Sequence, residues 1–111
     1  AGVDDAIAAT PSARLRVAVD DHEQVVGYAI TGRSGPRGYL QRLAVAPGQQ
    51  GQGYGAALVL DGLRWLRRWG ARDVLVNTQE ENTAAVSLYQ RLGFRLEADG
   101  LAVLHRRVGA G

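Results

Sequence analysis

The sequence predicts an α/β (α+β) protein built on one mixed central sheet, with elements in the order β-β-β-α-β-α-β-β. Two segments with helical apolar spacing, at 53–69 and 83–92, predict the helices, and short apolar or alternating runs around them predict strands. Adjacent strands at both ends of the chain have the spacing of hairpins, which are antiparallel. The connection through the first helix instead implies a parallel pair at the centre, so the sheet is predicted to be mixed.

Three strands precede the first helix. Polar and apolar residues alternate over Arg14–Val19, which predicts a half-buried strand. A second strand at 24–31 follows the turn at 20–22, and the two strands are expected to form a hairpin. The segment 32–38, which has three glycines and a proline, predicts a loop. The third strand, 39–46, has an apolar end that favours a central position covered on both faces.

The first helix is predicted from about Gly53 to Trp69, with Gly70 placed to end it. A fourth strand follows at Asp73–Thr78, and a strand-helix-strand connection of this length implies that it lies parallel to the third strand. We interpret the two tryptophans as core residues. One face of the helix gathers its apolar residues: Leu58, Gly62, Trp65, Leu66 and Trp69.

The second helix is expected to be capped by Asn82 or Thr83 and to end at Gly93. Two further strands, Phe94–Glu97 and Leu101–Arg107, are predicted to form the last hairpin. The inner face of this helix is predicted to consist of Ala85, Leu88, Tyr89 and Leu92.

Composition excludes several classes of site. The 111 residues predict one domain over 1–111, and the absence of cysteine excludes disulfides, thiolate metal sites and a cysteine nucleophile. No signal peptide and no apolar run of membrane-spanning length occur, so the expected location is cytoplasmic, without a membrane partner. The net charge is only +2 and the arginines are dispersed, which predicts no nucleic-acid partner. One cluster, Arg64, Arg67 and Arg68, is interpreted as a solvent-exposed helix face.

A glycine-rich stretch, Gln50-Gly51-Gln52-Gly53-Tyr54-Gly55, lies between the third strand and the first helix. The first N–H groups of a helix have no internal partner and lie at the positive end of its dipole, so this junction predicts a pyrophosphate site. The glycine spacing is GxGxG rather than the GxGxxG of dinucleotide folds. A P-loop is excluded because the chain has no lysine.

Two blocks resemble motifs of the GCN5-related N-acetyltransferase (GNAT) family. Leu43–Pro47 followed by Gln50–Leu58 resembles its motif A, whose loop pattern Q/R-x-x-G-x-G/A is met by Gln50, Gly53 and Gly55. The block Asn82–Phe94 resembles its motif B. The resemblance implies a GNAT-type sheet in which the family's N-terminal strand and helices are missing or truncated.

The resemblance also implies acetyl transfer from acetyl-CoA to an amine. Main-chain N–H groups from Gln50 through Gly51, Gly53, Tyr54 and Gly55 to Ala56 would hold the pyrophosphate. At the end of the third strand, where third and fourth strands would have to diverge, Leu43 N–H would polarise the acetyl carbonyl and Val45 would bind the pantetheine arm. Asn82 would contact pantetheine, or else act only as a helix cap. Tyr89 would donate a proton to the leaving thiolate as general acid, or else serve as a core tyrosine.

No general base follows from the pattern. Asn77 stands where many relatives carry glutamate, and Glu80, Glu81, His22 and His105 are weaker alternatives. An ordered water, or an amine already neutral, would need no base. Two functions remain open on this sequence: a small-molecule or peptide N-acetyltransferase, and a non-catalytic acetyl-CoA-binding domain or half of a tandem protein. A basic nucleic-acid module is a third hypothesis, which the dispersed arginines disfavour. The acceptor is expected to be selected by segments 32–38 and 98–100, and the protein to be a monomer or a homodimer.

Overall fold

The computed structural model describes residues 13–78, 82–96 and 102–108, and only the backbone of 102–105. The elements are β1 (Ala13–Val19), β2 (Val25–Ser34), β3 (Arg37–Val45), a short 3-10 helix η1 (Pro47–Gln49), α2 (Tyr54–Arg68), β4 (Asp73–Thr78), α3 (Thr83–Arg91), β5 (Arg95–Leu96) and β6 (Ala102–Arg107). This order of strands and long helices is the predicted one. The expectations for Glu80, Glu81 and segment 98–100 concern residues that the structure does not describe.

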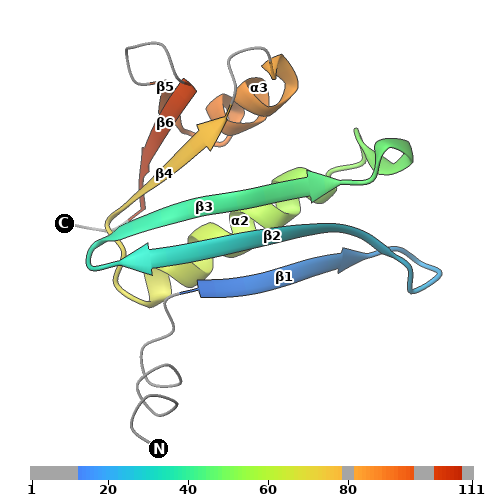
Figure 1. Cartoon of the computed structure of the whole chain (residues 1–111), viewed down its shortest axis with the longest axis horizontal. Helices are drawn as coiled ribbons and strands as arrows, with labels where there is room; N and C mark the ends of the chain where they lie inside the picture. Colours follow the sequence, from blue (N-terminus) through green and yellow to red (C-terminus); the bar gives the residue numbers. More distant parts are fainter. Residues whose placement is uncertain (1–12, 79–81, 97–101, 109–111) are drawn as a thin grey trace, which may run out of the picture.

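The strands form one sheet in the order β1-β2-β3-β4-β6-β5. β3 and β4 pair in parallel, and all other described neighbours pair antiparallel, so the prediction of a mixed sheet is confirmed. Figure 1 shows α2 crossing behind β2 and β3 while α3 lies beside β4. The core lies between the helices and the sheet, where Val59, Leu66 and Val74 are fully buried.

The prediction of a loop over 32–38 is wrong. β2 extends to Ser34 and β3 begins at Arg37, which leaves a tight turn at Gly35 and Pro36. Gly38 is a buried strand residue, and a β-carbon there would lie 2.6 Å from Leu66 Cδ1 of α2. This glycine therefore permits close helix-to-sheet packing, which glycine content alone cannot distinguish from a turn.

We expect Gly38→Ala to lower the free energy of unfolding by about 1–3 kcal/mol, the usual cost of overpacking a core. The added methyl must displace Leu66, a fully buried side chain. Gly48→Ala is the matched control, because a β-carbon at Gly48 has no heavy atom within 4 Å. Urea unfolding of both variants measures the difference. Equal stabilities would show that the core yields at no cost.

The predicted face of α2 is only partly right. Leu58, Gly62 and Leu66 are buried as expected, but Trp69 is 39% exposed, and Trp65 packs only at the margin of the core. Trp69 lies beyond the last residue of α2, at the point where Gly70 adopts a left-handed φ of 94°. The N–H groups of Gly70 and Ala71 bond back to the carbonyls of Arg67 and Leu66, which confirms Gly70 as the end of the helix. The residues that the periodic pattern missed are Val59 and Leu63, both buried.

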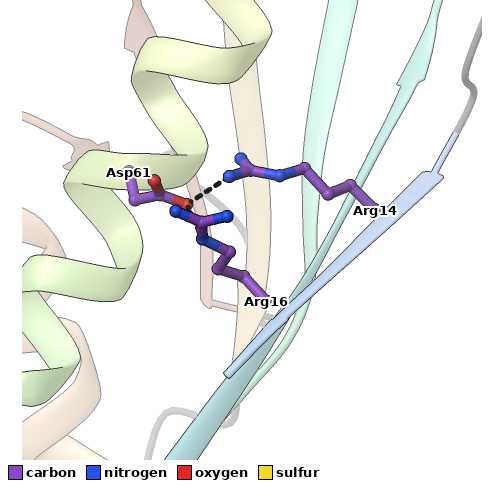
Figure 2. A network of polar contacts seen from close by, with 3 residues as sticks. All are labelled: Arg14, Arg16 and Asp61. Carbon is purple, nitrogen blue, oxygen red and sulfur yellow. Dashed lines mark ion pairs between the residues drawn. The ribbon is translucent and has the colours of Figure 1, made fainter. Parts of the chain in front are cut away.

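An ion-pair cluster connects β1, which is at one edge of the described sheet, to α2 (Figure 2). Asp61 Oδ2 lies 2.9 Å from Arg14 Nη2 and 3.5 Å from Arg16 Nε, without the alignment of a hydrogen bond. The Arg14 guanidinium also lies 5.6 Å from the ring centroid of Trp65, within cation–π range. These contacts show that Arg14 and Arg16 are on the α2 side of β1. The alternating residues Leu15, Val17 and Val19 therefore lie on the opposite face.

Candidate active site

The central feature of the site is the divergence of β3 from β4. Their parallel pairing runs only from Arg37–Asp73 to Leu40–Val76, although β3 continues to Val45. The end of β4 stays paired with β6 instead. Figure 1 shows the two strands starting together and separating toward their C-terminal ends. Within the described sheet, the C-terminal half of β3 is thus paired only with β2, on one side, as the resemblance implied.

A β-bulge marks the point of divergence. Ile30 of β2 is opposite Arg42, but the next residue, Thr31, is opposite Leu40, so Gln41 is an extra residue on β3. A bulge bends the strand that carries it and increases local twist. The bulge therefore explains why β3 turns away from β4 directly after Leu40. Nothing in the residue types around Gln41 predicts its position.

Beyond the bulge, the backbone of β3 presents N–H groups to the gap, that is, the space between β3 and β4 where the two strands diverge. Ala46 donates its N–H to the Val26 carbonyl at 2.8 Å, across the β2–β3 pair. Successive residues of a strand direct their N–H groups alternately to its two sides, so those of Leu43 and Val45 face away from β2. The Val45 carbonyl faces the same way and accepts a hydrogen bond from Gln50 Nε2 at 3.2 Å. Both predicted backbone donors therefore line the gap.

A cavity of about 280 Å³ opens where the strands part. Its lining combines the amides of Gln41 and Asn77, the phenol-bearing Tyr39 and two leucines, Leu40 and Leu75. Of these residues, only Asn77 was predicted from the sequence to lie at the site. Tyr39, Leu40 and Gln41 lie on β3 directly before and at the bulge, and Leu75 is the β4 register partner of Tyr39.

The glycine-rich stretch forms the predicted strand-to-helix junction. Gly51 and Gly53 have left-handed φ values of 83° and 91°, which disfavour other residue types. The first helical hydrogen bond of α2 runs from Ala57 N–H to Gly53 O at 3.0 Å. The N–H groups of Tyr54, Gly55 and Ala56 therefore come before the first hydrogen bond of the helix. The first turn of α2 contains no acidic residue to oppose an anion.

The second predicted block folds as α3, beside the N-terminus of α2. A β-carbon on Gly55 would lie 3.3 Å from Leu88 Cδ2, which places α3 against the start of α2. Asn82 caps α3, and its side-chain oxygen accepts the Ala85 N–H at 3.2 Å. The side-chain oxygen of Asn82 is thus used by the cap, and the predicted contact of this side chain with pantetheine would be an additional role that stays a prediction. Gly93 ends the helix with φ 96°.

Tyr89 lies on the inner face of α3 and is 4% exposed. Its ring meets Phe94 edge to face, with centroids 5.5 Å apart. Burial raises the pKa of the Tyr89 phenol above its usual value of 10.0, because the phenolate would lose hydration. The phenol is therefore fully protonated at neutral pH, as a proton donor must be. The same contacts also suit a core tyrosine, so its catalytic role stays a prediction.

The structure describes two of the candidate general bases, Asn77 on β4 and His22 in the turn between β1 and β2. Asn77 lines the cavity, but an amide cannot take up a proton at neutral pH. His22 lies in the exposed turn between β1 and β2, where Asp20 Oδ1 accepts its N–H at 2.8 Å. Glu80 and Glu81 lie outside the described residues, as does the side chain of His105. In the described part of the chain, no group of His, Asp and Glu residues is arranged to hold a metal ion.

Segment 32–38 and the arginine cluster both lie away from the Gln50 loop. The turn that remains of segment 32–38 lies at the start of β3, at the opposite end from the Gln50 loop (Figure 1), and its role in selecting the acceptor stays a prediction. The exposed Arg64, Arg67 and Arg68 lie in the last turns of α2, also at the end remote from the loop. Within the described ranges, no helix is long and apolar enough to cross a membrane.

The family can be assigned from comparison with known proteins. The model of the acetyltransferase (GNAT) family matches residues 3–94. The chain belongs to this family. A mycothiol acetyltransferase of Renibacterium salmoninarum is 38% identical over 95 residues, which are 79% of this chain and 28% of that protein. One of Geodermatophilus obscurus is 48% identical over 69 residues, 60% of this chain and 22% of that protein. The chain thus spans about a quarter of these relatives' length.

Solved structures of GNAT proteins share the fold. A GCN5-related N-acetyltransferase from Kribbella flavida superposes with a TM-score of 0.78 at 34% identity, over 94% of this chain and 76% of that chain. The PaiA N-acetyltransferase of Thermoplasma acidophilum, solved in complex with coenzyme A, gives a TM-score of 0.82 at 18% identity. It covers 93% of this chain and 65% of the other, and this likeness concerns the fold alone. The GNAT-type mixed sheet is therefore confirmed.

Proposed function

We propose that the protein is an N-acetyltransferase that transfers the acetyl group of acetyl-CoA to a primary amine of a small molecule or peptide, by direct attack in a ternary complex. One observation carries the proposal: the unpaired edge of β3 beyond Leu40 lies directly before a glycine-framed helix N-terminus. An extended chain with a pyrophosphate at one end needs both features, in this order.

The residues present fit such a ligand. The N–H groups at the start of α2 would hold the pyrophosphate, and Gln50 keeps the loop against the end of β3 through the Val45 carbonyl. The N–H of Val45 would bind the pantetheine arm as an added strand does, with the Asn82 amide as a further contact. Acetyl-CoA would supply the acetyl group as a thioester.

Catalysis would rest on two groups of this chain. Leu43 N–H faces the gap and would stabilise negative charge that develops on the acetyl oxygen during attack. Tyr89 would give its proton to the departing thiolate, and the proton that the neutral amine loses on forming the amide would restore the phenol through water. The cavity at Gln41 and Asn77 would receive the amine, which these amides can orient but not deprotonate.

The first test is a calorimetric titration of the folded protein with acetyl-CoA, with NAD as control ligand. We expect acetyl-CoA to bind and NAD not to bind, because the GxGxG loop and the strand gap suit a pantetheine chain. A panel of amines then follows, including the acceptor of the mycothiol acetyltransferases, with turnover measured as thiol release. Since the chain has no cysteine, the protein itself contributes no thiol. For an acceptor that carries its own thiol, turnover is measured instead as the mass of the acetylated product.

The outcomes separate the proposal from its alternative. Binding with release of thiol that depends on an amine supports the enzyme. Binding without turnover by any amine favours a non-catalytic acetyl-CoA-binding domain, for which the position of Asn77 beside the cavity is the specific argument. If the folded protein did not bind acetyl-CoA, the proposed cofactor site and the proposed activity would both be wrong.

A further inference from the structure

The C-terminal end of α3 is a Schellman motif, and Tyr89 is part of it. The Phe94 N–H donates to the Tyr89 carbonyl at 3.0 Å. The Gly93 N–H donates to the Gln90 carbonyl at 3.1 Å, and Gly93 has the left-handed φ of 96° that this motif needs. An apolar contact across the helix end often accompanies the motif, and the rings of Tyr89 and Phe94 make it here. The end of α3 therefore fixes both the backbone and the ring of Tyr89.

Arg106 of β6 completes this end of the helix. Its Nε donates to the Leu92 carbonyl at 2.7 Å, and its Nη1 donates to the Arg107 carbonyl at 3.0 Å. A β-carbon on Gly93 would lie 2.9 Å from Arg106 Nε, so a side chain there would push the guanidinium away from Leu92. The last carbonyls of a helix have no partner within the helix, and a cation at this end interacts favourably with the helix dipole. Arg106 supplies both the donor and the cation.

The same contact connects α3 to the wall of the gap. Arg106 is the register partner of Val74, a fully buried residue of β4, so its side chain lies on the face of the sheet that the helices cover. β6 pairs with β4 along Asp73–Thr78, and β4 forms one side of the gap. A helix of nine residues is too short to be stable alone. The position of Tyr89 relative to the gap therefore depends on what holds α3 to its neighbours.

We propose that Arg106 is a positioning residue for Tyr89. By binding the Leu92 carbonyl, it holds the last turn of α3 where the Tyr89 hydroxyl reaches the departing thiolate. This inference rests on the proposed function, in which Tyr89 is the proton donor. Without the contact the phenol keeps its chemistry but loses its geometry, and a displacement of about 1 Å can cost 10²-fold in rate.

Two replacements of Arg106 separate its hydrogen bond from the other properties of the side chain. Glutamine places an amide nitrogen where arginine has Nε, so Arg106→Gln keeps a donor for the Leu92 carbonyl. Methionine places a methyl group there, so Arg106→Met keeps the length but has no donor. We expect kcat to fall by about 10-fold in Arg106→Met and to stay near that of the unmodified chain in Arg106→Gln, with little change in the KM for acetyl-CoA. Circular dichroism verifies that both variants fold. A folded Arg106→Gln variant with a 10-fold loss of kcat would overturn the proposal.

The same replacement in a Tyr89→Phe background distinguishes positioning from general stabilisation. If Arg106 acts through the Tyr89 hydroxyl, Arg106→Met has no further effect on kcat once that hydroxyl is absent, whereas its effect on stability remains. A loss of kcat by the same factor in both backgrounds would refute the inference and leave Tyr89 as the donor. Unchanged kcat in Tyr89→Phe alone would refute the proton donor itself, and the inference about Arg106 would fail with it.

Hydrogen exchange at the Phe94 amide gives a readout that needs no turnover, because this N–H is bonded to the Tyr89 carbonyl. We expect exchange to be about 10-fold faster in Arg106→Met, the factor that loss of one charge-assisted hydrogen bond implies, and slower in Arg106→Gln than in Arg106→Met. Equal exchange rates in the unmodified chain and in Arg106→Met would show that Arg106 does not hold this end of α3, and would overturn the proposal.

Discussion

Loss of the Leu43 N–H is expected to lower kcat by about 10²–10³-fold while acetyl-CoA still binds. That factor, roughly 2.7–4 kcal/mol, is the usual effect of removing one oxyanion donor. Leu43→Pro removes the N–H without removing a β2–β3 hydrogen bond, because this group faces the gap. Binding should persist, since the helix N-terminus and Val45 hold parts of the coenzyme remote from the reacting carbonyl. Steady-state kinetics together with calorimetry would show the separation of kcat from affinity.

Proline also changes the side chain and restricts the backbone, so a finer replacement is needed. Exchange of the Leu43 peptide bond for an ester keeps the leucine side chain, which packs at the margin of the core. The matched control is the same exchange at Ala44, whose N–H faces β2. We expect the Ala44 ester to lower the free energy of unfolding by about 1 kcal/mol and to leave kcat unchanged. If both esters affected kcat equally, the assignment of Leu43 as the oxyanion donor would fail.

Much of the fold was predictable because its signals are local. The bounds of β4 were predicted at both ends, since an apolar run lies between a turn and a polar loop. Both helices end at glycines with left-handed φ, Gly70 and Gly93, as their positions after periodic segments predicted. Parallel pairing of β3 with β4 followed from the length of the crossover through α2. These inferences use contacts between residues close in sequence.

The errors arose where a distant contact decided the structure. Gly38 belongs to β3 because Leu66 occupies the space of its missing side chain, and nothing near Gly38 in sequence reveals that. Trp69 fits the apolar spacing of α2 but lies past its end, so it is exposed. The site shows the same division. The glycine junction is a local pattern, whereas the bulge at Gln41 and the cavity beside it depend on how β2, β3 and β4 pair.

Replacement of Tyr89 by phenylalanine is expected to lower kcat by about 10²-fold or more, the lower end of the effect of a positioned proton donor. Phenylalanine keeps the edge-to-face contact with Phe94, so the change removes the hydroxyl and little else. Stopped-flow or steady-state measurement of thiol release, with a fixed amine, gives the comparison. Unchanged turnover would make Tyr89 a core tyrosine without a catalytic role.

The pH dependence follows from the direction of the pKa shift. Burial raises the pKa of Tyr89 above 10.0, and only the protonated phenol can act as donor. Activity that depends on Tyr89 should therefore persist through neutral pH and fall only as pH rises through this raised pKa. The free energy of unfolding is expected to fall over the same range of pH as the activity. The folded chain holds this proton more tightly than the unfolded chain. The protonated phenol therefore contributes fully to the free energy of unfolding below pH 10.0, and this contribution is lost as pH rises through the raised pKa.

A variant at Phe94 distinguishes the role of the Tyr89 hydroxyl from the packing of its ring. Phe94→Leu removes the aromatic partner of Tyr89 but leaves its hydroxyl in place. We expect Phe94→Leu to lower the free energy of unfolding by about 1 kcal/mol, the order expected for an aromatic pair, with kcat little changed. Tyr89→Phe should show the reverse pattern, with kcat reduced and the alkaline loss of stability absent. If the two variants lost kcat in proportion to their loss of stability, the ring's packing, and not proton donation, would account for Tyr89.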